Sequence, residues 1–97
     1  MATVKIEILN KKNEPVVYRS VEITTRHYRD FLQMNADIEK ESSEVEKLNK
    51  QLDFIASLFD KVNIDMLLDQ TDMTQIYEIL STLYSHLVGS VDPKPSN

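Results

Sequence analysis

The sequence predicts an α+β protein that is mostly α: an N-terminal β-hairpin followed by three to four amphipathic helices that form a small bundle. Residues 3–9 alternate apolar and polar side chains, as in a half-buried strand. Residues 25–62 repeat an apolar side chain every three or four positions, as in a helix. The 97 residues include only one Gly and three Pro, so few positions favour turns. We expect one domain over residues 3–89 and a flexible tail over residues 90–97.

The first strand has Val4, Ile6 and Ile8 on one face and Lys5 and Glu7 on the other. A polar run over residues 10–15 ends in a proline and predicts a turn. A second β-rich run covers residues 16–23, with a less regular alternation. The simplest interpretation is a hairpin. Two strands alone are marginal in water, so the hairpin must pack on the helices or extend another sheet.

The longest periodic stretch runs through residues 25–62. Its seam of one polar and nine apolar residues comprises Phe31, Met34, Ile38, Glu41, Val45, Leu48, Leu52, Ile55, Phe59 and Val62. Thr24 or Thr25 can cap its start. The stretch is compatible with one helix of about 38 residues or with two helices that meet near Ser42 and Ser43. Ser43 and Glu46 have the spacing of a capping box, and two helices could bury their seams against each other, so we favour a break there.

Two further helices follow. Asn63 can cap a short helix over residues 64–69. Thr71 or Asp72 then begins the last helix, and Asp72 has capping-box spacing to Gln75. The predicted seam of this helix consists of Met73, Ile76, Leu80, Leu83 and Leu87. Gly89 lies where a helix end favours a left-handed residue.

No set of residues points to catalysis, a metal or another cofactor. The two histidines, His27 and His86, lack a second ligand at helical spacing, so we expect surface roles for both. The chain has no cysteine, which excludes thiolate metal sites and fits a reducing, cytoplasmic compartment. The net charge of -5 disfavours nucleic acid and anionic membranes as partners. The first residues do not resemble a signal peptide, and no apolar run is long enough to span a bilayer.

Aromatic residues beside the seams are the remaining candidates for function. Tyr28, Tyr77 and Tyr84 fit the edge of a core, with the hydroxyl in water. Alternatively they bind a partner together with the apolar residues Phe31 and Leu32, because tyrosine is enriched at interaction hot spots. Two seams and a half-apolar hairpin exceed what one small core hides, so we expect apolar contacts with another chain. The partner could be a client protein or a second copy of the chain.

The succession of these elements resembles one family. A β start is followed by ITTRHYRDFLQMNADIEKE, a charged run, and LDFIASLFDKVNIDMLLDQTDMTQIYEILSTLYSHLVG. Leu58, Phe59 and Asp60, the Ile/Leu-rich turn after them and the Val-Gly end of the last helix are the most characteristic parts. Over residues 3–89 the order is similar to that of the tail assembly chaperones of long-tailed phages and prophages of Gram-positive bacteria.

The resemblance implies a non-enzymatic protein of the bacterial host cytoplasm. Members bind the tape measure protein while the tail tube forms around it, and they are absent from the mature virion. The tail tube protein is a further possible partner, and many members also exist in a longer, frameshifted form. Two alternatives remain: an acidic phage-encoded regulator that inhibits a host protein, and a small hydrolase or metal enzyme, which the missing catalytic set disfavours.

Overall fold

The computed structural model describes residues 3–89, and the expected flexible tail over residues 90–97 lies outside them. Two strands are followed by four helices: β1 (Lys5–Leu9), β2 (Pro15–Arg19), α1 (Thr25–Lys40), α2 (Glu44–Leu58), α3 (Ile64–Gln70) and α4 (Met73–Leu87). The prediction of an α+β, mostly α protein with an N-terminal hairpin is confirmed.

The hairpin pairs β1 with β2 in antiparallel orientation, with Glu7 opposite Val17. Val4, Ile6 and Ile8 are buried, as the alternation predicts. The turn is closed by Asn10, whose side-chain oxygen accepts the backbone N–H groups of Lys12 and Glu14 at 2.8 and 3.0 Å. Local side-chain acceptors of this kind are typical of tight turns.

The second strand is shorter than predicted, because it ends at Arg19 rather than Ile23. The next residue, Ser20, is buried, and its hydroxyl accepts the Val4 N–H and donates to the Val21 carbonyl oxygen. Val21 then donates its own N–H to the Leu58 carbonyl oxygen at 2.8 Å. The backbone thus leaves the hairpin after Ser20, and Val21 connects it to the end of α2.

The break in the long periodic stretch is confirmed. α1 ends at Lys40, and Ser43 caps α2 by accepting the Glu46 N–H at 3.3 Å. Glu41, the one polar residue in the predicted seam, lies in the connection. Its carboxylate accepts the Ser43 N–H at 3.1 Å and lies 3.9 Å from the ammonium group of Lys50. The polar residue therefore closes the turn between the two helices.

One residue of that seam is misplaced by the periodicity. Val45 is 66% exposed, whereas Leu52 and Ile55 of the same helix are almost fully buried. The prediction for Val45 is wrong because the chain breaks between α1 and α2, so Val45 lies in the first turn of a new helix. Its first turn extends past the elements that cover the rest of the helix.

The remaining helix ends follow the predicted signals. Asn63 caps α3 by accepting the Met66 N–H at 2.9 Å, and Asp72 caps α4 by accepting the Gln75 N–H at 2.9 Å. Gly89 follows α4 with φ of 74°, a left-handed conformation that glycine adopts without a steric penalty.

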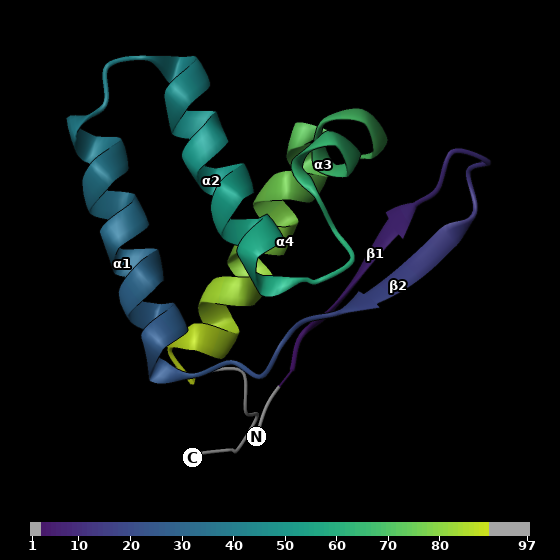
Figure 1. Ribbon diagram of the computed structural model, residues 1–97, viewed down its shortest axis with the longest axis horizontal. Helices are drawn as coiled ribbons and strands as arrows, with labels where there is room; N and C mark the ends of the chain where they lie inside the picture. The colour runs from purple at the N-terminus through teal and green to yellow at the C-terminus, as the bar shows by residue number, and fades with distance from the viewer. Residues whose placement is uncertain (1–2, 90–97) are drawn as a thin grey trace.

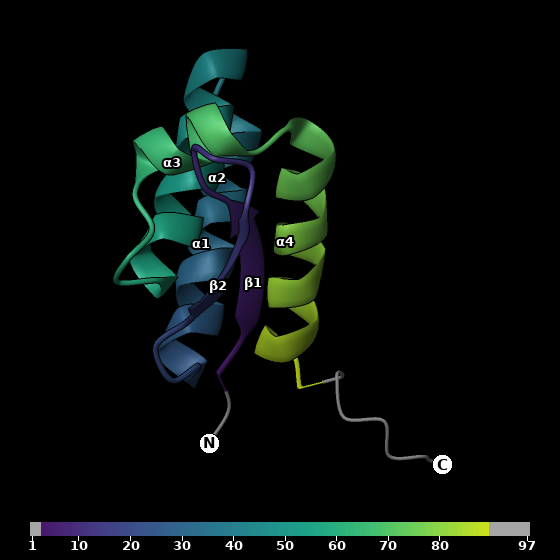
Figure 2. The same cartoon turned by 90° about the vertical axis from the view of Figure 1, so that its right-hand side faces the viewer.

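The elements surround one core. α1 and α2 form an antiparallel pair, α4 crosses beside them and α3 covers one end (Figure 1). Figure 2 shows β1 between β2 and α4. The buried apolar residues come from β1 and the residue before it, from every helix and from the α2–α3 connection. They are Val4, Ile6, Ile8, Phe31, Met34, Leu52, Phe54, Ile55, Leu58, Phe59, Val62, Leu67, Ile76, Ile79 and Leu83. Ile79 was missing from the predicted seam of the last helix, and Met73, which was in it, is 40% exposed.

Candidate partner-binding surface

Helix α4 carries more apolar surface than the core covers. Ile76, Ile79 and Leu83 are buried. A neighbouring row follows helical spacing and comprises Met73, Tyr77, Leu80 and Tyr84, which we call the α4 stripe. Tyr77 is 61% exposed, Tyr84 48% and Met73 40%. Two neighbouring rows of the helix are therefore apolar. The first is buried in the core, and the α4 stripe is exposed apart from Leu80, which is half-buried against the core.

Helix α1 meets the α4 stripe at Tyr84. The ring of Phe31 lies 5.5 Å from the ring of Tyr84, centroid to centroid, and 5.6 Å from that of Phe54 on α2. Tilted aromatic pairs at this separation are favourable beyond the area they bury. Phe31 is itself buried, so the Tyr84 ring packs on a fixed side chain of the core. Leu32, the next residue of α1, is 48% exposed.

The five sequence-predicted residues thus occupy two helices. Phe31 and Tyr84 are in contact. Tyr28 and Leu32 lie on α1 within one helical turn of Phe31, Tyr28 half-buried against the core and Leu32 exposed. Tyr77 lies two turns before Tyr84 on the same side of α4. The structure therefore places Tyr77, Tyr84 and Leu32 on the surface and gives Phe31 a supporting position.

The other end of the stripe opens into an apolar hollow that sequence reasoning missed. Its volume is about 180 Å³, and it is lined by residues of α2, α3 and α4, among them Leu48, Leu68, Met73 and Ile76. Leu68 is 51% exposed. The signal was available in the run Met66–Leu68, because three successive apolar residues of a short helix cannot all face one core.

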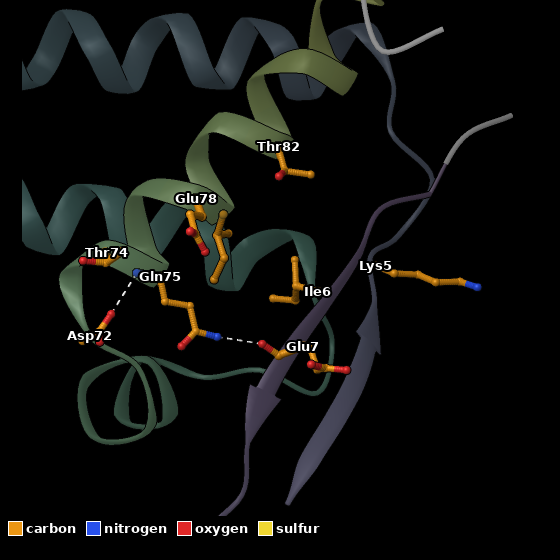
Figure 3. Close-up of a pocket in the computed structure, with 9 residues that line it drawn as sticks. Lys5, Ile6, Glu7, Asp72, Thr74, Gln75, Glu78 and Thr82 are labelled. Carbon is orange, nitrogen blue, oxygen red and sulfur yellow. Dashed lines mark hydrogen bonds between the residues drawn. The ribbon is translucent and has the colours of Figure 1, made fainter. Parts of the chain in front are cut away.

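A larger hollow between β1 and α4 is polar. Figure 3 shows Glu7, Gln75, Glu78 and Thr82 around it, with Lys5 pointing away. Gln75 donates its side-chain amide to the Glu7 carbonyl oxygen at 2.7 Å. The lining offers carboxylates, amides and hydroxyls but no cysteine or histidine. Within residues 3–89, no group of three metal-ligating side chains is close enough to hold a metal ion.

Both histidines take part in local contacts at helix ends. The Thr24 N–H donates to Nδ1 of His27 at 2.9 Å, so this nitrogen carries no proton in that bond. Nδ1 of His86 lies 3.0 Å from the Thr82 carbonyl oxygen, which requires a proton on that nitrogen. The two side chains lie on different helices, and each contacts a backbone group near the end of its helix.

No helix within the described part of the chain is long and apolar enough to cross a membrane. An exposed apolar row such as the α4 stripe, on a small helical domain, is typical of a protein-interaction domain. A family model described as phage tail chaperone protein matches residues 1–97, the whole chain. The chain belongs to this family, and the resemblance found in the sequence is confirmed. Comparison with curated proteins and with solved structures gave no match.

Proposed function

We propose that the protein is a non-enzymatic chaperone that binds the tape measure protein in the cytoplasm of the infected or prophage-carrying bacterium. The client is covered while the tail tube assembles, and the chaperone is absent from the mature virion. Family membership supports the role in tail assembly. The proposed binding site rests on the α4 stripe, in which Tyr77 and Tyr84 remain exposed.

The surface suits an amphipathic helix of the client. A helix laid along α4 would meet anchors at helical spacing, from Met73 at one end to Tyr84 at the other. Large aromatic side chains contribute most of the energy at such interfaces and lose little side-chain entropy on binding. The apolar hollow beside Met73 can accept one side chain of the client helix. No covalent chemistry is required.

Release matters as much as binding, because the tail tube protein must replace the chaperone. A contact made of a few exposed side chains is weak for each copy, and several copies along an elongated client provide the coverage. This arrangement lets individual copies leave one at a time as the tube grows. The acidic-regulator alternative has no support from the family match.

Co-expression with the tape measure protein, followed by affinity capture of the chaperone, tests the proposal. We expect the client to become soluble and to co-purify. Tyr77→Ser should weaken capture about tenfold or more, the loss typical of a hot-spot residue. Val17→Thr is a matched control, because Val17 is exposed to a similar extent, 59% against 61%, but lies on the hairpin. An insoluble client, or equal capture by both variants, contradicts the proposed site. Mass spectrometry of purified virions should detect no chaperone.

A further inference from the structure

The two outer edges of the hairpin differ. Ser20 donates its N–H to the Val4 carbonyl oxygen at 2.8 Å. Counting on by two residues, Ile6 opposite Tyr18 and Ile8 opposite Val16 are the hydrogen-bonded pairs of the hairpin. Because antiparallel ladders alternate, the residues between these pairs direct their N–H and C=O groups away from the partner strand. Each strand therefore presents a row of outward backbone groups.

The edge of β1 is closed by two glutamines. Gln75 of α4 donates to the Glu7 carbonyl oxygen at 2.7 Å, and Gln70 of α3 donates to the Leu9 carbonyl oxygen at 2.8 Å. These carbonyls are two residues apart, so the two side-chain amides occupy positions that a neighbouring strand would use. α4 also lies directly beside this edge (Figure 2). No further strand can pair there without displacing both amides.

The edge of β2 is open. Its outward residues are Pro15, Val17 and Arg19. Within residues 3–89, no hydrogen bond is assigned to the outward N–H and C=O groups of Val17 or Arg19. The Val17 side chain is 59% exposed. Unpaired backbone groups beside an exposed β-branched residue can act as a template for strand addition.

A recess lies between this edge and the α2–α3 connection, so the connection does not pack directly on the edge. It measures about 410 Å³ and is lined by β2 residues from Val16 to Arg19 and by Asp60 and Lys61 of the α2–α3 connection. Figure 2 shows this connection beside β2, on the side away from β1. A strand paired with β2 would place alternate side chains in the recess, as in known cases of β-augmentation.

We propose that the occupant is a second copy of the chain, which pairs its own β2 antiparallel to the first across a two-fold axis at Val17. The two Val17 residues exchange hydrogen bonds through their N–H and C=O groups. The Arg19 N–H of each copy donates to the Pro15 carbonyl oxygen of the other. The result is a continuous four-stranded sheet with the order β1-β2-β2-β1, closed at both outer edges by Gln70 and Gln75.

The side chains favour this register. The two exposed valines lie opposite each other and cover one another, and on the inner face Val16 lies opposite Tyr18 of the second copy. Each Arg19 faces Pro15, so the two guanidinium groups stay apart. A shift to an axis at Tyr18 would set each Val17 opposite an arginine and bring the two Arg19 side chains into diagonal contact. The edge is self-complementary in the register centred on Val17, as a two-fold interface requires.

The dimer is independent of the proposed client site. The α4 stripe belongs to the helix beside β1, on the opposite side of the hairpin from β2 (Figure 2). Loss of the dimer leaves Tyr77 and Tyr84 unchanged, and loss of client binding leaves Val17 unchanged. The short edge predicts a weak, concentration-dependent association, because small interfaces are typically transient.

Sedimentation velocity over a concentration series tests the proposal with Val17→Pro and Val17→Thr. Proline removes the outward N–H but no ladder bond within the hairpin, and edge strands tolerate it. We expect the wild type and Val17→Thr to dimerise, and Val17→Pro to associate at least about tenfold more weakly. A wild type that stays monomeric throughout the series overturns the proposal, as does a dimer that Val17→Pro leaves intact.

Amide hydrogen exchange of the wild type provides a second measurement that does not depend on the folding of the proline variant. Exchange at Val17 and Arg19 should slow as the protein concentration rises, because both amides enter the new ladder. The Glu7 N–H, on the closed edge of β1, serves as the internal reference and should not change. Exchange at Val17 that is independent of concentration, in a sample that contains dimer, overturns the proposed interface.

Discussion

The side-chain amide of Gln75 lies 2.7 Å from the carbonyl oxygen of Glu7, across 68 positions of sequence. This bond ties α4 to the hairpin at a point where β1 has no neighbouring strand. The Asp72 cap fixes the first turn of α4, so the Gln75 side chain leaves a rigid position. The bond therefore joins two elements that the core also connects.

Gln75→Ala should lower the free energy of unfolding by about 0.5–1.5 kcal/mol, the net value of one hydrogen bond. Urea unfolding measures the change. Thr74→Ala is the control, since Thr74 is exposed in the same turn and no hydrogen bond is assigned to its side chain within residues 3–89. Equal losses in the two variants would show that the bond does not contribute.

Leu52→Ala should destabilise the protein by about 2–5 kcal/mol, because the side chain is 1% exposed and its removal leaves a cavity in the core. Val45→Ala, a change at another residue of the predicted seam, should alter stability by less than about 0.5 kcal/mol, since Val45 is exposed. Thermal or urea unfolding distinguishes the two. A loss below about 0.5 kcal/mol for Leu52→Ala would contradict its place in the core.

Ser43→Ala should cost about 0.5–2 kcal/mol, because the Glu46 N–H loses its acceptor at the start of α2. Ser42→Ala is the matched control: Ser42 is the exposed neighbour, and α2 does not use it as a cap. Circular dichroism at increasing urea concentrations gives both values. A larger loss of stability for Ser42→Ala than for Ser43→Ala would show that Ser42 caps α2 instead of Ser43.

A chain that ends at Gly89 should keep its helical circular dichroism and its melting temperature. Residues 90–97 contain two prolines and a single apolar residue, Val91, which is too little to dock on the domain. A clear fall in melting temperature would show that these residues contribute to the folded domain.

Local signals predicted most of the fold. Side-chain caps at Ser43, Asn63 and Asp72 act over three residues, and the structure has all three. Period-two alternation likewise identified the buried face of β1. Such signals are readable because the interacting groups are neighbours in sequence.

Contacts between distant elements could not be predicted in the same way. Gln75 has the spacing of a capping-box partner, yet its side chain turns to β1 because the Glu7 carbonyl oxygen is available there. The contact of Phe31 with Tyr84 joins the first and last helices. On α4, apolar residues cover so wide an arc that periodicity alone could not decide between Ile79 and Met73 for burial.

The two apolar rows of α4 link the stability of the fold to the binding of a ligand at the α4 stripe. A ligand that lies along the α4 stripe needs the helix to be formed, and the helix is held by Ile76, Ile79 and Leu83 in the core. Such a ligand therefore binds the folded chain and not the unfolded one. By mass action, a client at 100 times its dissociation constant adds about 2.7 kcal/mol to the free energy of unfolding. The melting temperature of the chaperone thus reports how much of it is loaded, without any label on either partner.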